Sequence, residues 1–381
     1  MRRPLLSAAL IVRDESAFLA GCLASVRAVV DEIVVVDTGS VDDTPDIALA
    51  AGAVVHHRPW QGSFAEARNA ALDAAHGEWI LYIDADERLQ PVARAHLEAL
   101  LRRPDAIAYR LLLRPSPRAT PYREYRLWRN DARIRFDGVI HEKVVPAIHA
   151  VADADRREVL LCDLELVHHG YEGDQTRKHH RNLPLLLRQR ELEPGNLFVH
   201  HHLARVQEGL GDPRAAEATL DGGLEVARAK PWRDPLAVLL YADLTRLRLL
   251  DGQDPADLLD EGLGSFPDNL VLLWLQARLL IRSREYERAL GVLDRIRATD
   301  PAALPDKGPS YDEELLGELP HEARGLCMFR LGRYAEAAVE YAAALSFAPA
   351  NAEYRTKLVL ATARARGRVP GPDYLAGGLG R

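Results

Sequence analysis

Residues 78–87 read EWILYIDADE, an apolar run from Trp79 to Ile83 followed at once by two aspartates, Asp84 and Asp86. Residues i and i+2 of a strand share a face, so both carboxylates should point into one crevice at the strand's C-terminal end. Open α/β sheets bind their ligands at that end. Two anions this close repel each other unless a cation lies between them, and carboxylate oxygens suit Mg²⁺ or Mn²⁺. Because Asp-x-Asp pairs are also common in solvated loops, the residues around this one must decide between the two interpretations.

The composition excludes some classes of partner. With 381 residues, of which 48% are hydrophobic and 28% charged, the chain can form about two or three soluble domains. A net charge of −7 argues against general binding to nucleic acid or to an anionic membrane. A locally basic stretch runs from Arg123 to Arg135 and either faces phosphates or is an ordinary solvated surface.

The sequence predicts a cytoplasmic protein without a transmembrane segment. An apolar run from Leu5 to Val12 superficially resembles a signal sequence, but Asp14 and Glu15 interrupt it early. No stretch reaches the roughly 18 to 20 apolar residues needed to span a bilayer. The three cysteines lie in different segments, which implies neither a disulfide framework nor a zinc site.

Short apolar runs alternate with helical patterns in the first part of the chain. This βαβ order with short connections predicts an α/β domain with a mostly parallel sheet covered on both faces. Strand-like segments separated by Pro, Gly and charged turns follow and predict an antiparallel extension. The expected strands are 5–12, 32–36, 53–56, 79–83, 106–113, 125–128 and 159–167, and the expected helices are 17–29, 44–51 and 64–76.

The strand patterns end after residue 171, and helix pairs with small residues at close-approach positions take their place. They occupy 203–217, 272–300 and, most clearly, 323–349. The pattern resembles the tetratricopeptide repeat (TPR), which has a period of about 34 residues. An unspecialised helical bundle is the alternative. Residues 301–309 and the tail from Gly367 are expected to be loops.

Two further motifs stand near the ends of predicted strands. Asp37 ends the second strand and begins the motif DTGS, where its carboxylate can accept hydrogen bonds from a uracil N–H or a ribose hydroxyl. The same motif could be a purely structural βα turn. Arg68-Asn69 lies in the helix that precedes the Asp84 strand; such a pair is normally solvated, but here it is one connection from the candidate metal ligands.

The order of the motifs RDE (13–15), DTGS (37–40), RNA (68–70) and WILYIDADE (79–87) resembles the family 2 glycosyltransferases with a GT-A fold, over about residues 5 to 171. The resemblance implies an inverting, metal-dependent hexosyltransferase that moves a sugar from a nucleotide-sugar donor, with a UDP-sugar favoured, to an acceptor hydroxyl or thiol. It implies that Asp86 binds the divalent metal and that Asp84 holds the ribose and contributes to the metal site. Relatives often carry Asp at the position of Thr38. The implied nucleotide-sugar-binding residues are Asp14, Glu15, Asp37, Thr38, Arg68, Asn69 and Asp84.

Two later motifs extend the resemblance. In FDGVIHE (136–142), Glu142 falls where an inverting transferase carries its general base. His141 could also take the proton, or the pair could form a salt-bridged turn. In VHHGY (167–171), a histidine, His168 in preference to His169, would complete the metal shell or hold the pyrophosphate. Imidazole beside carboxylate favours Mn²⁺ slightly over Mg²⁺. The run His200-His201-His202 receives no role, because its side chains point in different directions on a helix.

We therefore expect a GT-A catalytic domain over residues 1–175, a TPR-like domain over 176–366 that recruits a peptide or protein acceptor or a partner, and a flexible tail over 367–381. A TPR adaptor whose front domain binds nucleotide without turnover is one alternative, although a relic would have no reason to keep the complete set of site residues. A nucleotidyltransferase is the other, but it usually opens with a Gly-rich, basic phosphate loop after the first strand, where this chain has Arg13-Asp14-Glu15.

Overall fold

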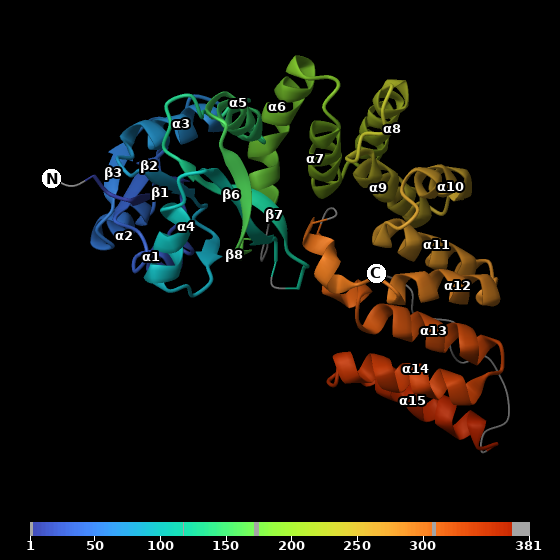
Figure 1. Ribbon diagram of the computed structural model, residues 1–381. Helices are drawn as coiled ribbons and strands as arrows, with labels where there is room; N and C mark the ends of the chain where they lie inside the picture. The colour runs from blue at the N-terminus through green and yellow to red at the C-terminus, as the bar shows by residue number, and fades with distance from the viewer. Residues whose placement is uncertain (1–2, 117, 171–174, 307–309, 368–381) are drawn as a thin grey trace. The chain divides into compact units, whose positions relative to one another are not determined.

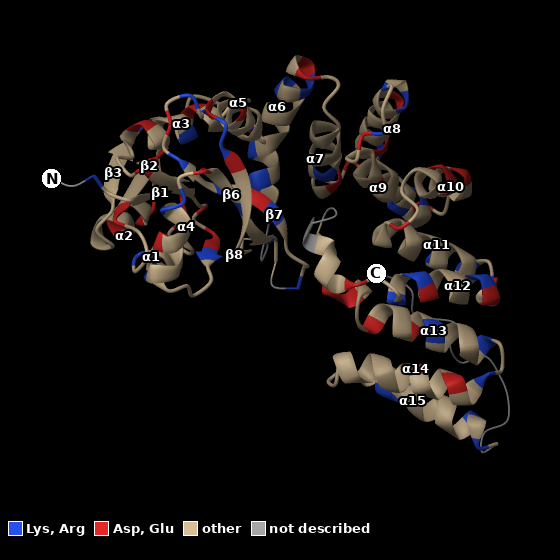
Figure 2. Ribbon diagram, viewed as in Figure 1, with Lys and Arg blue, Asp and Glu red and all other residues tan. Residues whose placement is uncertain are grey.

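The computed structural model describes residues 3–116, 118–170, 175–306 and 310–367 (Figure 1). The chain divides into two compact units. The first comprises Met1–Leu240 together with Ala302–Ser310, and the second comprises Tyr241–Pro301 together with Tyr311–Arg381. Acidic and basic residues are interspersed on the helices of each unit (Figure 2).

The first unit is built on a mixed sheet with the strand order β3-β2-β1-β4-β7-β6-β8-β5. Strands β1 to β4 are parallel, and β7 runs antiparallel between β4 and β6. The strands are β1 Leu6–Val12, β2 Glu32–Asp37, β3 Val54–His57, β4 Trp79–Tyr82, β5 Glu87–Leu89, β6 Ala106–Arg114, β7 Tyr122–Arg129 and β8 Glu158–His168. This mixed sheet confirms the predicted α/β fold class.

Helices cover both faces of the sheet because its strands bury side chains in both directions. Alternate residues of β4 show this: Trp79 and Leu81 pack in one apolar cluster, whereas Ile80 packs in the other. The first cluster is completed by α1, α2 and α4 and the second by α3 and α5. These helices are α1 Leu19–Val26, α2 Thr44–Ala50, α3 Phe64–Ala74, α4 Arg94–Leu101 and α5 Val145–Asp155.

The structure differs from the expected elements in two respects. Strand β8, expected in an antiparallel extension, pairs antiparallel with β5 but parallel with β6. The short elements β5 and α4, together with α5, were not predicted. Three-residue β5 is too short to show a period, yet its pairing register sets Glu87 opposite His168 and so brings two distant motifs together.

Three helices after the sheet also belong to the first unit: α6 Thr176–Leu192, α7 Leu197–Gly209 and α8 Pro213–Ala229. Helices α6 and α7 are docked by an apolar cluster in which Leu186 of α6 and Val199 and Leu203 of α7 pack with Ile140. The loop that carries the candidate base is therefore packed against α6 and α7.

The remaining helices stack as successive antiparallel pairs in the second unit. Small residues allow the close approach: a side chain at Gly325 of α13 would collide with the Tyr341 ring of α14, and Ala337 and Ala344 are fully buried. The pairing confirms the TPR-like prediction. The helices are α9 Ala237–Leu250, which spans the division between the units, α10 Ala256–Ser265, α11 Leu270–Arg282, α12 Tyr286–Arg297, α13 Glu318–Arg330, α14 Tyr334–Phe347 and α15 Ala352–Ala365.

Two short 3₁₀ helices, Pro301–Asp306 and Glu313–Leu315, precede α13, and the first of them lies in the segment expected to be a loop. The predicted tail lies outside the described residues from 368 onward, as does Tyr171 of the last motif. Within the described part of the chain, no helix combines the length and apolarity required to cross a membrane.

Candidate active site

A cavity of about 210 Å³ opens at the C-terminal ends of β1, β2 and β4 in the first unit. Its floor carries the strand-end carboxylates, and α6 supplies part of its wall. This is the edge at which an α/β sheet binds ligands. The lining residues are Ile11, Val12, Arg13, Glu15, Thr38, Trp60, Phe64, Arg68, Asp84, Ala85, Asp86, His168, Lys178 and Arg181.

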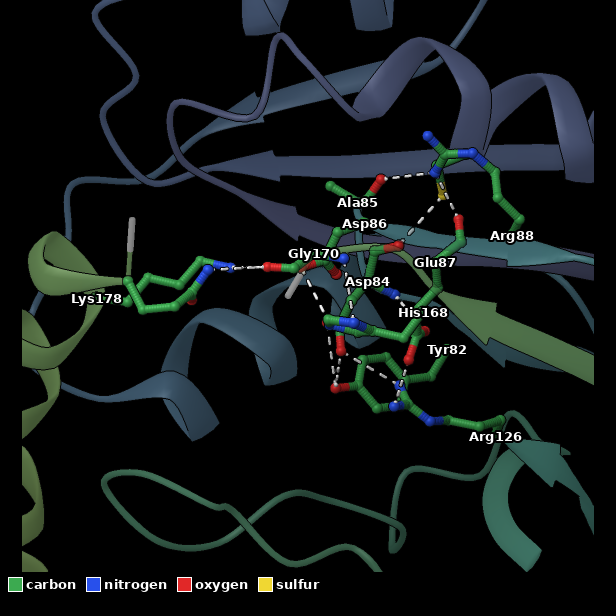
Figure 3. A network of polar contacts seen from close by, with 12 residues as sticks. Tyr82, Asp84, Ala85, Asp86, Glu87, Arg88, Arg126, His168, Gly170 and Lys178 are labelled. Carbon is green, nitrogen blue, oxygen red and sulfur yellow. Dashed lines mark hydrogen bonds and ion pairs between the residues drawn. The ribbon is translucent and has the colours of Figure 1, made fainter. Parts of the chain in front are cut away.

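Asp84 is held between two arginines from distant parts of the chain. Its Oδ1 accepts a hydrogen bond from Arg68 Nη1 at 3.0 Å, and its Oδ2 lies 3.4 Å from Arg126 Nη1. The Tyr82 hydroxyl also donates to this carboxylate, at 3.2 Å (Figure 3). Burial alone would raise the pKa of Asp84, but the two guanidinium charges outweigh it and hold the pKa below the ordinary value.

The arginines extend this contact into a chain of alternating charges. Arg126 also pairs with Glu87 at 2.8 Å, and Arg68 Nε donates to Glu142 Oε1. Both guanidinium groups lie over the ring of Tyr82, with Cζ 4.2 and 4.3 Å from its centroid. The order Glu87–Arg126–Asp84–Arg68–Glu142 therefore links the strand-end motif to the predicted base.

Asp86 faces His168 across the β5–β8 pairing. The distance from Asp86 Oδ2 to His168 Nε2 is 3.2 Å, and the backbone N–H of His169 donates to the Asp86 carbonyl. Gly170 is required here, because a Cβ at that position would collide with the Asp86 carboxylate. Burial raises the pKa of Asp86, but the hydrogen bond and charge of His168 lower this pKa by more than burial raises it, so the net shift is downward.

The donor set at Asp86 and His168 fits a divalent cation that keeps other ligands. Among the described residues no group of three or more His, Cys, Asp or Glu side chains could enclose a metal ion. A carboxylate and an imidazole can nevertheless supply two ligands, and Mg²⁺ or Mn²⁺ in phosphate-transfer sites commonly takes the rest from water and substrate phosphates. Asp84 is the weaker candidate ligand, since two arginines already engage its oxygens.

Helix α6 supplies cations that the sequence analysis missed. Lys178 reaches over the cavity with its Nζ 3.6 Å from Asp86 Oδ2 (Figure 3), and Arg181 lines the same wall with its guanidinium over the Phe64 ring. Arg13 adds a third positive charge to the lining. The basic run TRKHHR at 176–181 was the available indication, but the predicted boundary at residue 175 assigned it to the helical domain.

Glu15 is the third acidic residue of the cavity. Burial, reinforced by the nearby charge of Asp86, raises its pKa to about 7. Its neighbour Asp14 has a different position: the carboxylate accepts a hydrogen bond from the Val41 N–H and pairs with Arg177, so it holds the loop around the cavity. The Val41 hydrogen bond is the main reason that the pKa of Asp14 is lowered.

Two of the predicted nucleotide contacts already have partners in the protein. Asp37 is buried and accepts hydrogen bonds from Ser40 N and Oγ, and it faces His57 at 3.2 Å. Asn69 uses both ends of its amide on the backbone of Phe136. Thr38, in contrast, lines the cavity. Contacts of Asp37 and Asn69 with a nucleotide stay predictions.

Glu142 and His141 lie on a loop beside the cavity. The Glu142 side chain is 7% exposed and reaches the cavity wall through Arg68. The ring of His141 packs at a tilt against that of His202 on α7, with centroids 4.0 Å apart. Burial lowers the pKa of His141 to about 4, so it is neutral and weakly basic at pH 7. His200, in contrast, faces the backbone carbonyls of Thr219 on α8 and of Pro194 before α7.

Comparison with known proteins agrees with this geometry. Residues 7–144 match the family described as glycosyl transferase family 2. A TPR repeat-containing protein of Synechococcus elongatus is 37% identical over 235 residues, which cover 59% of this chain and 58% of that protein. The prophage-derived glycosyltransferase SunS of Bacillus subtilis is 27% identical over 202 residues, covering 51% and 47%. The chain thus spans about half the length of these curated relatives.

Solved structures show similarity at a lower level. Glucosyl-3-phosphoglycerate synthase from Mycobacterium tuberculosis is 18% identical, with a TM-score of 0.35, over 48% of this chain and 78% of that one. YrrB, a TPR protein, is 16% identical with a TM-score of 0.38, over 48% and 84%.

The sheet, the cavity and the match of residues 7–144 make the first unit similar to the glycosyltransferases with a GT-A fold. In this chain, the segment that matches glycosyl transferase family 2 is followed by a TPR-like helical region.

Proposed function

We propose that the chain is an inverting glycosyltransferase that uses a nucleotide-sugar donor, a UDP-sugar in the first instance, together with Mn²⁺ or Mg²⁺. The observation that carries the proposal is the composition of one cavity. The Asp86–His168 pair lies beside the cations of Lys178 and Arg181 at the ligand-binding edge of a family 2 domain. The basic side chains suit the negative charge of a diphosphate, and the Asp86–His168 pair suits the cation bound to it.

The basic residues of the cavity account for stabilisation of the leaving group. Breaking the sugar–phosphate bond leaves negative charge on the nucleoside diphosphate. Lys178, Arg181 and Arg13 can bind that charge through charge-assisted hydrogen bonds. Asp86 and His168 would hold the divalent cation, which when bound supplies further neutralisation of the diphosphate.

Glu142 is the proposed proton acceptor. The acceptor oxygen or sulfur forms its bond to the anomeric carbon, its proton passes to the Glu142 carboxylate, and the bond to the diphosphate breaks on the opposite face. Arg68 keeps this carboxylate close to the cavity wall. His141 is a poorer base, because burial lowers its pKa to about 4.

The proposed acceptor follows from the helical region. TPR-like helix pairs offer surfaces suited to extended peptides, so we propose that a polypeptide hydroxyl or thiol receives the sugar. One observation favours a second candidate, a nucleotide-binding adaptor without turnover. The Glu142 side chain is 7% exposed and paired with Arg68, as expected of a structural carboxylate.

Release of nucleoside diphosphate from UDP-, GDP- and dTDP-sugars, measured with and without Mn²⁺, separates these candidates. The transferase should release product from one donor class in the presence of the metal. Glu142→Gln should keep donor binding and lose roughly 10²- to 10⁴-fold in turnover. Glu158→Gln, an exposed glutamate at the start of β8, is the matched control. Metal-dependent UDP binding with no turnover of any donor would support the adaptor instead.

A further inference from the structure

The loop that carries Glu142 has an unusual backbone. An isolated bridge pairs Asp137 with Lys143, and between them Gly138 has a φ of +109° and His141 a φ of +53°. Gly138 adopts such a conformation easily, whereas for His141 it is costly. A left-handed non-glycine residue persists only where its surroundings impose it, and such residues cluster at functional sites.

Two rings of helix α7 pack against His141. The ring of His202 packs against the His141 ring, with centroids 4.0 Å apart and the ring planes tilted by 31°. Phe198, one turn earlier on α7, meets both rings edge-on, at 5.2 Å from His141 and 4.2 Å from His202. Burial lowers the pKa of both histidines, so two neutral rings face each other at pH 7.

Helix α6 holds the other side of the same loop. The Val139 N–H donates to Oε1 of Gln189, which is 3% exposed, at a distance of 2.8 Å. Ile140 packs among the apolar residues of α6 and α7. The Gln189 and Ile140 contacts hold the first half of the loop. Next to Glu142, the rings of His202 and Phe198 pack against His141, and Lys143 pairs with Glu193 at the end of α6.

From Glu142 the contacts continue into the cavity. Glu142, the residue after His141, pairs with Arg68, and Arg68 pairs with Asp84 on the cavity floor. A shift of the His141 backbone would therefore move the carboxylate that faces Arg68.

We propose that His202 is a positioning residue for sugar transfer: its ring keeps His141 in the left-handed conformation and thereby fixes Glu142 against Arg68. The inference rests on the proposed function, in which Glu142 takes the acceptor proton. It also assigns α7, in the predicted TPR-like segment, a role in the transfer step.

The test compares three variants of the full chain. His202→Ala removes the ring, and His202→Phe restores a ring of similar shape. His200→Ala is the control: it removes a buried histidine of the same helix whose described hydrogen bonds go to the carbonyls of Thr219 and Pro194. If His202→Ala does not fold, His202→Leu, which fills the space without a ring, replaces it.

Amide hydrogen exchange is the readout that does not depend on activity. His202→Ala should speed exchange at residues 139–143, His202→Phe should restore protection, and His200→Ala should leave these amides unchanged. Unchanged exchange at 139–143 in His202→Ala overturns the proposal, even if the chain turns over no sugar nucleotide.

Kinetics form the second readout, with UDP-glucose hydrolysis in Mn²⁺ as the probe. A misplacement of about 1 Å can cost roughly 100-fold in rate. We therefore expect kcat to fall at least about tenfold in His202→Ala, with UDP affinity nearly unchanged and most activity regained in His202→Phe. Equal impairment of the Ala and Phe variants, or of His200→Ala, contradicts the positioning role. Failure of wild type and of all variants to turn over UDP-glucose while the exchange pattern holds would count against the proposed function alone.

Discussion

Replacing Arg68 with methionine removes the cation at the centre of the charge chain. Arg68 contacts Asp84 and Glu142 at once, and its side chain is 11% exposed. Methionine keeps much of the aliphatic length and still packs against Tyr82, so the substitution removes charge more than volume.

The size of the effect follows from which carboxylate is left without a partner. Asp84 retains Arg126 at 3.4 Å and the Tyr82 hydroxyl, whereas Glu142 loses its only cationic partner among the described residues. Removing one member of a buried ion pair typically costs about 3 to 5 kcal/mol. We expect Arg68→Met to lower the unfolding free energy of the first unit by about that amount.

The acid dependence provides an independent check on the same variant. The folded-state pKa of Asp84 is depressed below its unfolded value of about 3.9. Its contribution to stability is therefore present above about pH 4 and is lost as the pH falls through the folded pKa. Because Arg68 is the largest favourable influence on Asp84, Arg68→Met should lose less stability on acidification than wild type.

Urea denaturation followed by tryptophan fluorescence measures these changes, since Trp79 and Trp128 are fully buried in the sheet. The double variant Arg68→Met/Glu142→Gln should cost clearly less than the sum of the single changes, because it removes the orphaned charge. Arg133→Met, which breaks only exposed pairs with Asp131 and Asp155, is the matched control and should change stability little. A loss below about 1 kcal/mol for Arg68→Met, within the range of exposed pairs, would refute the buried charge chain.

Two further predictions concern the cavity. Lys178→Met should weaken UDP binding in Mn²⁺ about tenfold, since a hydrogen bond to a charged group contributes about 1.5 kcal/mol or more. The control Arg214→Met, which changes an exposed arginine on α8, should bind UDP as wild type does. Equal UDP titration curves for Lys178→Met and wild type would contradict a role of Lys178 in diphosphate binding. Glu15→Gln should raise the metal-free thermal midpoint at pH 8 but not at pH 4. The pKa of Glu15 is raised to about 7 in the folded protein, so its ionisation opposes folding only as the pH rises above the unfolded pKa of about 4.5. An unchanged midpoint at pH 8 would show that Glu15 is well solvated.

The parallel half of the fold could be predicted because β1, β2 and β4 are buried on both faces and appear as continuous apolar runs. The position of the cavity could be predicted because strand ends converge at one edge. Glu15, Thr38, Arg68, Asp84 and Asp86 accordingly line it together. Short β5 and the parallel pairing of β8 could not be predicted, since register between distant segments leaves no local pattern.

The partners of the site residues were beyond the sequence for the same reason. Arg126 lies 42 residues after Asp84 in the chain and reaches it because β7 pairs with β4. Lys178 and His202 belong to helices that the sequence analysis placed in the repeat domain. In the structure both helices lie within the compact first unit, which continues to Leu240. Helical periodicity identifies a helix but does not show on which domain it docks.

Titration of UDP into the protein, with Mn²⁺ and with chelator, tests most directly that the Asp86–His168 cavity is a nucleotide-sugar site. Wild type should bind UDP in Mn²⁺ and bind it at least about tenfold more weakly without the metal, a difference of about 1.4 kcal/mol. Asp86→Asn should keep its thermal midpoint in the absence of metal and lose the Mn²⁺ dependence. UDP affinity that is the same with and without Mn²⁺, or unchanged in Asp86→Asn, would contradict the account.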